Sequence, residues 1–112
     1  MSATPKMFNV ANIDNALQTV YTCPALTFAF VHNLILCNVG AVAITVNCTI
    51  RDVSAGITTF LVKAASIPVG GSLVVLGDNN KQALEATDFI QCGADAGTNV
   101  LDVTGSVLEQ SA

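Results

Sequence analysis

An alternation of side-chain character over Val42–Arg51 sets the tightest limit on the fold. Every second residue is apolar, namely Val42, Ile44, Val46, Cys48 and Ile50. The residues between them are mostly polar, namely Ala43, Thr45, Asn47, Thr49 and Arg51. Because successive side chains of a β-strand point to opposite faces, this period of two predicts a strand with one face on a core. A helix would scatter the same residues around its circumference.

The chain from Leu17 onward has the same β character. β-branched residues dominate segments that are bounded by Gly, Pro, Asn and Asp. The expected strands are Gln18–Cys23, Thr27–Val39, Val42–Asp52, Thr58–Ser66, Ser72–Leu76, Phe89–Gly93 and Val100–Glu109. Residues 79–86 are expected to form a loop followed by a short extended piece. Short strands with regular turn signals predict an all-β, single-domain antiparallel β-sandwich of jelly-roll type.

The segment Thr27–Val39 is apolar on both of its alternating faces. One face carries Phe28, Phe30, Leu34 and Leu36 together with His32, which we expect to be packed. The other face carries Ala29, Val31, Ile35 and Cys37. Either the strand is central or its outer face is covered by a partner, because one face of each sheet in a sandwich normally meets solvent. We assign the covered face to Ala29, Val31 and Ile35.

Residues 1–16 are the least regular part of the chain. Thr4-Pro5 and a series of Asn and Asp residues discourage regular structure. Four residues are nevertheless apolar enough to favour burial, namely Met7, Phe8, Val10 and Ile13. We therefore predict an extended N-terminal arm at 1–16 that leaves the sandwich domain of residues 17–112 and packs on something else, such as a neighbouring subunit. The alternative is a disordered terminus.

Charge is scarce for a chain with this much apolar content. Only 11% of the residues are charged and 52% are hydrophobic, whereas an ordinary soluble domain carries about a quarter charged residues. The most apolar region, 26–50, is interrupted by polar residues and lacks the ~18 uninterrupted apolar residues of a membrane helix. We infer that other protein molecules cover much of the surface.

The few charges also disfavour two classes of partner. Eight acidic residues oppose four basic ones, for a net charge of -4. The basic residues are Lys6, Arg51, Lys63 and Lys81. They form no basic run that could neutralise phosphates, so we expect neither nucleic acid nor an anionic membrane as a partner.

The cysteines are expected to be reduced. The N-terminal residues lack the basic-then-apolar pattern of a secretory signal, so we expect the chain to be made and kept in a cytoplasm. The four thiols belong to Cys23, Cys37, Cys48 and Cys92. They contain no CxxC pair, which disfavours a zinc site, and a disulfide framework is the minor alternative.

No pattern in the sequence indicates catalysis. His32 is the single histidine, a GxSxG motif is absent, and no basic residue adjoins Cys37 or Cys48. Glu85 and Asp88 could contribute to a weak calcium site, but the dense acidic loop of such a site is missing. We therefore expect no catalytic residue, no cofactor and no metal.

A series of short motifs runs through the chain from about Thr19 to Glu109. The motifs are TVYTCPA at 19–25, LCNV at 36–39, IPVGGSL at 67–73, LEATDFI at 84–90, VLDV at 100–103 and SVLE at 106–109. In this order they resemble the small β-sandwich virion structural proteins of tailed bacteriophages. The chain departs from that pattern at Cys23, Cys37 and Cys92, where a valine or another small apolar residue is more usual.

The resemblance implies a non-enzymatic capsid decoration (cement or staple) protein. Such a protein would be made in the host bacterial cytoplasm, bind the major capsid protein on the outer shell, bridge capsomers, and form a homo-oligomer such as a dimer or trimer. The expected contacts are Met7, Phe8, Val10 and Ile13 of the arm and Ala29, Val31 and Ile35 of the covered face. Two alternatives are a tail, neck or baseplate subunit and a glycan-binding module of a receptor-binding fibre. The absence of Trp and the single Tyr21 disfavour the second.

Overall fold

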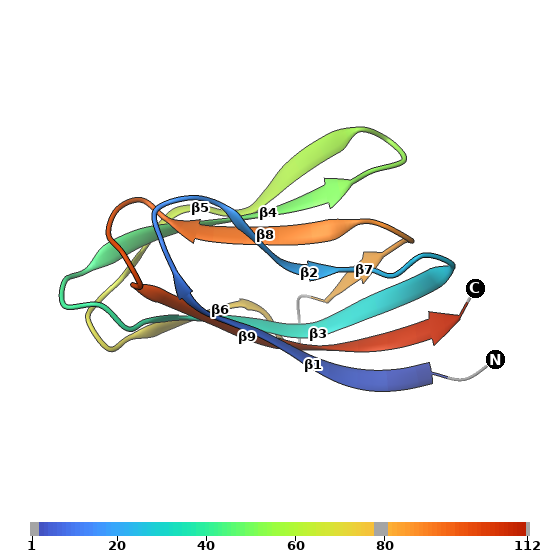
Figure 1. Cartoon of the computed structure of the whole chain (residues 1–112), viewed down its shortest axis with the longest axis horizontal. Coiled ribbons are helices and arrows are strands. Elements are labelled where there is room, and N and C mark those ends of the chain that lie inside the picture. The colour runs from blue at the N-terminus through green and yellow to red at the C-terminus, as the bar shows by residue number, and fades with distance from the viewer. Residues whose placement is uncertain (1–2, 78–80, 112) are drawn as a thin grey trace.

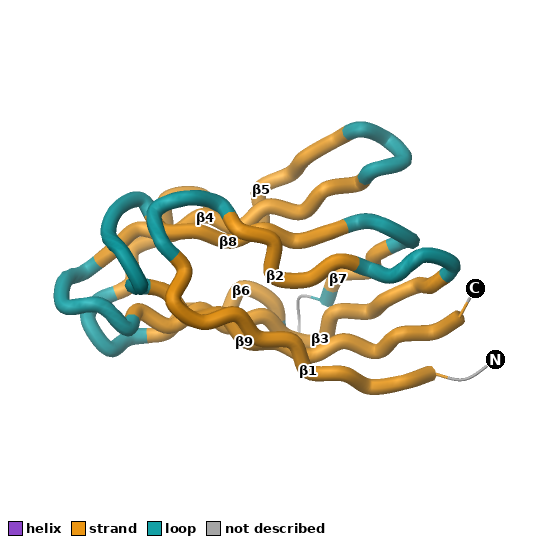
Figure 2. Tube along the Cα trace, in the orientation of Figure 1, coloured by secondary structure: helices purple, strands orange, loops and turns teal. Residues whose placement is uncertain are grey.

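The computed structural model describes residues 3–77 and 81–111, and this part of the chain is all-β (Figure 1). Its strands are β1 (Ala3–Ile13), β2 (Gln18–Thr22), β3 (Thr27–Asn38), β4 (Ile44–Asp52), β5 (Ile57–Ile67), β6 (Ser72–Leu76), β7 (Gln82–Leu84), β8 (Phe89–Ala94) and β9 (Leu101–Ser111). Sheet A has the order β1-β9-β3-β6, with β7 also paired to β3, and sheet B has the order β2-β8-β4-β5. Figure 2 shows the strands in two layers, joined by loops.

The strands pair in a nested order. β1 pairs with β9, β2 with β8, β3 with both β6 and β7, and β4 with β5, each time antiparallel. A chain in which the first strand meets the last and the second meets the last but one is a long hairpin rolled into two sheets, which is the jelly roll. The predicted antiparallel β-sandwich of jelly-roll type is confirmed.

The core lies between the two sheets and follows the predicted alternation. Ile44, Val46 and Cys48 of β4 are buried, while Thr45 and Asn47 between them are partly exposed. Leu34, Leu36, Ile90 and Leu101 complete the centre of the core and are fully buried. Within the described residues, no helix is long and apolar enough to cross a membrane.

Residues 3–13, for which the sequence predicts an arm, form β1 at the edge of sheet A. The strand pairs with β9 from Ala3 opposite Gln110 to Ile13 opposite Leu101. Phe8 and Ile13 are buried in the core of this same chain, at 9% and 0% exposure. A jelly roll needs a first strand beside its last, and an edge strand tolerates the proline and asparagines that break regular patterns elsewhere.

A β-bulge in β3 changes which side chains face the core. Val31 lies opposite Val107 and Asn33 lies opposite Ser106, so β3 has one residue more than β9 at this point. The inward side chains are therefore Ala29, Val31, Leu34 and Leu36, and the outward ones are Phe28, Phe30, Ile35 and Cys37. His32, which was expected to be packed, is exposed at the bulge. The sequence pattern assumed an unbroken period of two, and one extra residue reverses the faces on one side of it.

Candidate docking surface on sheet A

The outer face of sheet A carries large apolar side chains that the core does not bury. The strand register places Leu108 of β9 between Pro5 of β1 and Phe30 of β3, so one apolar row crosses three strands. Ile35 of β3 lies opposite Val74 of β6 and continues the row along the sheet. We define the sheet A face as Pro5, Met7, Phe28, Phe30, Ile35, Val74 and Leu108.

Several side chains of the sheet A face are strongly exposed. Met7 is 73% exposed, Val74 61%, Phe28 45% and Phe30 43%. Single exposed apolar residues are ordinary, but a contiguous group of them on one face is typical of an interaction site. Among the paired residues of β1, β3 and β9, the register places one charged residue, Asp102 of β9, on the outer side. The physical driving force that this face offers to a partner is therefore burial of apolar area.

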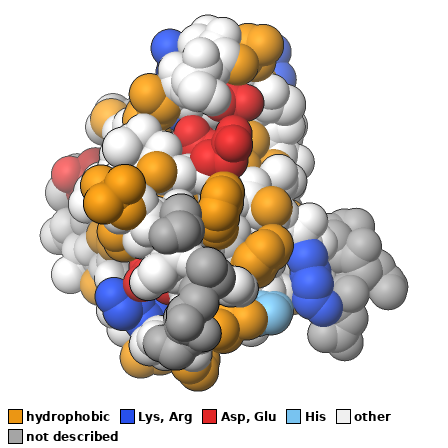
Figure 3. Space-filling model, turned by 90° about the vertical axis from the view of Figure 1, so that its right-hand side faces the viewer, with side chains coloured by type: hydrophobic (Ala, Val, Ile, Leu, Met, Phe, Trp, Pro, Cys, Tyr) orange, Lys and Arg blue, Asp and Glu red, His pale blue; other side chains and the backbone are white. Residues whose placement is uncertain are grey.

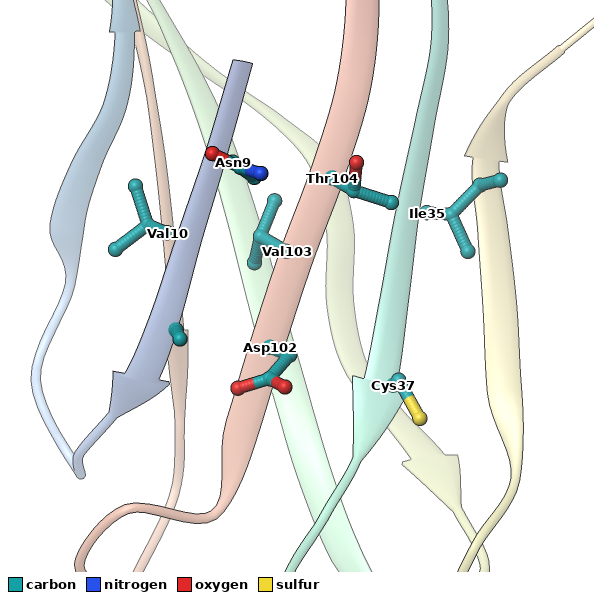
Figure 4. A pocket seen from close by; sticks show the side chains of 8 residues that line it. Asn9, Val10, Ile35, Cys37, Asp102, Val103 and Thr104 are labelled. Atoms are coloured by element: carbon teal, nitrogen blue, oxygen red, sulfur yellow. The ribbon is translucent and has the colours of Figure 1, made fainter. Parts of the chain in front are cut away.

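A shallow hollow of about 570 Å³ adjoins the sheet A face. Outward-facing residues of three strands line it, with Asn9 and Ala11 from β1, Asp102 and Thr104 from β9, and Ile35 and Cys37 from β3. Figure 4 shows these strands side by side, with labelled side chains around the hollow. The lining contains no basic residue and no histidine, so the hollow offers a recess for a partner's side chain and not a pair of groups for acid–base chemistry.

The structure separates the seven predicted contact residues into two groups. Phe8, Ile13, Ala29 and Val31 are buried in the core of this chain. Met7 is exposed, and Val10 and Ile35 are partly buried. Phe28, Phe30, Val74 and Leu108 were not predicted as contacts. The sequence pattern shows the aromatic face of Thr27–Val39, but an unbroken period of two places that face on the core side.

A partly buried polar cluster ties β1 to both sheets beneath the sheet A face. The Tyr21 hydroxyl of β2 donates to Oε2 of Glu109 at 2.5 Å, and Nζ of Lys6 lies 3.0 Å from Oε1 of the same carboxylate. Burial acts to raise the pKa of Glu109, but the hydrogen bonds from Tyr21 and Lys6 outweigh it and lower that pKa below its ordinary value. Burial, reinforced by the bond to Glu109, raises the pKa of Tyr21. The cluster fixes the edge strand that presents Met7.

Aromatic packing holds the same strand from inside. The rings of Phe8 and Tyr21 lie 5.2 Å apart between centroids. Phe8 lies opposite Gly105 of β9, and a Cβ atom on that glycine would lie 2.4 Å from the Phe8 ring. The glycine therefore leaves the space that the ring occupies. Phe8 is an internal anchor of β1, and its neighbour Met7 points to the opposite, outer face.

Three carboxylates gather away from the sheet A face, around the β4–β5 and β7–β8 loops. Oxygen atoms of Asp52, Glu85 and Asp88 lie within 4.8 Å of one another, and Figure 3 shows a group of acidic side chains among apolar ones. Asp88 accepts the backbone N–H groups of Val53 and Glu85, each at 3.0 Å. Asp52 accepts the backbone N–H of Ala55 at 3.2 Å and the hydroxyl of Ser54 at 2.9 Å. These bonds explain two of the carboxylates as caps of the loop backbone.

Comparisons with known proteins place the fold but not a family. No family model and no curated protein matches the sequence. Among solved structures, a chain of the T13 particle of infectious bursal disease virus has a TM-score of 0.52 and 11% identity, over 94% of this chain and 30% of that one. A pentameric capsid protein isolated from metagenomic phage sequences has 19% identity over 96% of this chain and 61% of that one, with a TM-score of 0.38.

The first of these likenesses shows a shared fold. This chain corresponds to about a third of the length of the infectious bursal disease virus chain. That chain is part of a viral particle.

Proposed function

We propose that this protein is a non-enzymatic structural protein of a bacteriophage virion, namely a decoration or cement protein on the outer capsid shell. The observation that carries the proposal is the sheet A face, which is largely apolar and which the described part of the chain leaves exposed. The jelly-roll fold, shared with a chain of a viral particle, supports a place in a virion. In this proposal the sheet A face docks on the major capsid protein.

The proposed mechanism is stabilisation by mass action. A protein that binds the assembled shell and not its dissociated subunits stabilises the shell by RT ln(1 + [L]/Kd) at each site, about 3 kcal/mol at a few hundred times Kd. A molecule that contacts two adjacent capsomers links them, so this free energy opposes their separation. Self-association into a dimer or trimer would multiply the contacts that each unit makes with the shell.

A binding assay with two matched variants tests the docking surface. Phe30 of β3 and Phe60 of β5 are exposed phenylalanines on different sheets, at 43% and 49%. Loss of a central apolar anchor typically costs 2 kcal/mol or more, so we expect Phe30→Asp to weaken binding to undecorated shells about 30-fold. Phe60→Asp should bind as the wild type does. Co-sedimentation of each variant with shells, at a series of concentrations, measures the two affinities.

Two results would contradict this assignment. If Phe30→Asp binds shells as tightly as the wild type does, the sheet A face is not the contact surface. If the wild type does not bind shells at all, the decoration role itself fails. Thermal unfolding of both variants must first confirm that each is folded.

The location in the particle needs a separate measurement. A decoration protein covers the shell in many copies, whereas a tail, neck or baseplate subunit is present in few. Imaging of particles that carry a labelled copy of the chain distinguishes the two, and we expect label over the whole shell. Label confined to the tail or neck would replace the decoration role with the alternative.

A further inference from the structure

We infer that Cys48 and Cys92 form a cross-strand disulfide when the chain is exposed to an oxidant, which links β4 covalently to β8 within sheet B. Cys48 of β4 lies directly opposite Cys92 of β8 in the strand register. Their Sγ atoms are 2.7 Å apart, and both residues are fully buried. This inference concerns the covalent state of the core and holds whether or not the chain decorates a capsid.

The strand geometry already satisfies what a disulfide requires. Directly opposed residues of an antiparallel pair have Cα atoms about 4.5–5.5 Å apart, and disulfides are found at Cα separations of 4.4–6.8 Å. The sulfur atoms would approach by about 0.7 Å to reach the disulfide bond length of ~2.05 Å. No change of register is therefore needed, and the bond would join strands that are neighbours in sheet B.

The other two cysteines occupy different environments. The Cys23 thiol donates to the backbone oxygen of Thr27 at 3.3 Å. Cys37 lies on β3 of sheet A, on its outer side and opposite Asp102 of β9. The sequence predicts four reduced thiols, because a cytoplasmic chain is expected and no CxxC pair occurs. The positions of Cys48 and Cys92 differ by 44, so no short motif marks the pair. The sheet register brings this one pair together.

The reaction balances with a small disulfide, such as oxidised glutathione, as the oxidant. One cysteine thiolate attacks the glutathione disulfide, whose S–S bond breaks and releases one glutathione thiolate. The second cysteine thiolate then attacks the protein sulfur of the mixed disulfide and releases the second glutathione. Two electrons pass from the cysteine pair to the oxidant, and the two thiol protons end on the two glutathione molecules.

Burial decides when this exchange can take place. Both thiols are inaccessible in the folded chain, and the contact with Cys48, together with burial, holds the pKa of Cys92 above its usual range. A thiol that stays protonated and covered reacts slowly. We therefore expect the disulfide to form during folding or local opening. In a reducing cytoplasm the two thiols should stay reduced, whereas a disulfide formed outside it should persist.

The Cys48–Cys92 disulfide can be tested by refolding the full chain under two conditions. One sample is refolded in a glutathione redox buffer and the other in excess reductant. Trypsin cleaves after Lys6, Arg51, Lys63 and Lys81. Cys92 then lies in the peptide 82–112, and the other three cysteines lie in 7–51. We expect a disulfide-linked pair of these peptides from the oxidised sample only. We also expect the oxidised protein to melt on the order of 10 °C higher than the reduced protein.

Four variants identify the partner of Cys92. The link should survive in Cys23→Ala and Cys37→Ala and disappear in Cys48→Ala and Cys92→Ala. In the wild type, labelling of free thiols after denaturation should mark Cys23 and Cys37 but not the other two, which gives an answer even if a variant fails to fold. Absence of a linked peptide in the refolded wild type, or a link that persists in Cys48→Ala, would overturn the inference.

Discussion

The outer faces of the two sheets differ in how they meet their surroundings. Sheet B presents polar side chains that bond to one another, as Gln91 does with Thr19 and Arg51 does with Thr58, at 3.2 and 2.9 Å, and its exposed Phe60 lies on the edge strand β5. The sheet A face presents exposed apolar side chains on all of its longer strands but one, namely Met7 of β1, Phe28 and Phe30 of β3, and Val74 of β6. A face that bonds to itself and to water needs no partner, while an apolar face gains free energy when one covers it.

The contrast also explains how a chain with so few charges can fold as a sandwich. Threonine, asparagine and glutamine supply the polar surface of sheet B without formal charge, and the β-branched threonine suits strands. Because the inward side chains of both sheets form the core, the low charge content affects the outer faces of the sheets. The sheet A face shows this most clearly, because its apolar residues are interrupted mainly by small polar residues such as Ser106 and Thr104 of β9 and by the exposed His32 of β3.

The largest effect that we predict is a difference in stability between variants of the inward and the outward side of β1, the edge strand of sheet A. Phe8→Ala should lower the free energy of unfolding by about 3 kcal/mol, because a buried ring is lost and Gly105 is left uncovered. Met7→Ala, one residue away on the exposed side, should change it by less than about 0.5 kcal/mol. Urea unfolding of both variants measures the difference.

Equal stability of these two variants would contradict the placement of β1 in the sandwich. It would favour the arm expected from the sequence, in which residues 1–16 leave the domain and Phe8 contacts another molecule. If Phe8→Ala is destabilised as expected while Met7→Ala loses shell binding alone, the two faces of β1 have the two separate roles that the register gives them.

A second, smaller difference in stability is expected between inward and outward side chains of β2 in sheet B. Tyr21 points inward and donates to Glu109, whereas Thr19 points outward and bonds to Gln91. Tyr21→Phe should cost about 1–2 kcal/mol at neutral pH, because a hydrogen bond to a buried charged group is lost. Thr19→Val should cost less than about 0.5 kcal/mol, since its bond is exposed.

The pH dependence of stability distinguishes the role of Glu109 from simple packing. The pKa of Glu109 in the folded chain lies below its ordinary value of 4.5. The ionised carboxylate therefore contributes stability that is fully present above pH 4.5 and is lost as the pH falls through the lower, folded-state pKa. Without the Tyr21 donor that pKa rises, so Tyr21→Phe should lose less stability on acidification than the wild type does. Parallel acid-induced unfolding curves for the two proteins would contradict this account.

How far the sequence predicts the molecule differs between the strands. The alternation of Val42–Arg51 predicts β4 because each apolar residue has one clear face. The face of β3 could not be predicted, since the bulge at His32 is a property of its pairing with β9 and leaves no mark in β3 alone. β1 was missed for a related reason, because its asparagines and proline weaken local strand propensity while Phe8 and Ile13 gain their burial from distant strands.

The same limit applies to the candidate sites. The scarcity of charge predicts an apolar surface that a partner covers, and it does not say which residues form that surface. The bulge decides this, because it turns Phe28 and Phe30 outward and Ala29 and Val31 into the core. The Cys48–Cys92 pair depends on the register between β4 and β8. Composition reports that a surface or a set of thiols exists, whereas strand register decides which residues belong to it.

The smallest effect that we predict concerns salt, and it tests the contrast between the sheets directly. Arg51 and Lys63 lie on sheet B, while the sheet A face has Asp102 near one end. Binding through sheet A should therefore depend on apolar burial, and its Kd should change less than about threefold between roughly 0.05 and 0.5 M salt. Contact through the charges of sheet B would instead weaken steeply as salt screens them. Titration of shells at several ionic strengths measures the slope, and a steep loss of affinity would move the contact from sheet A to sheet B.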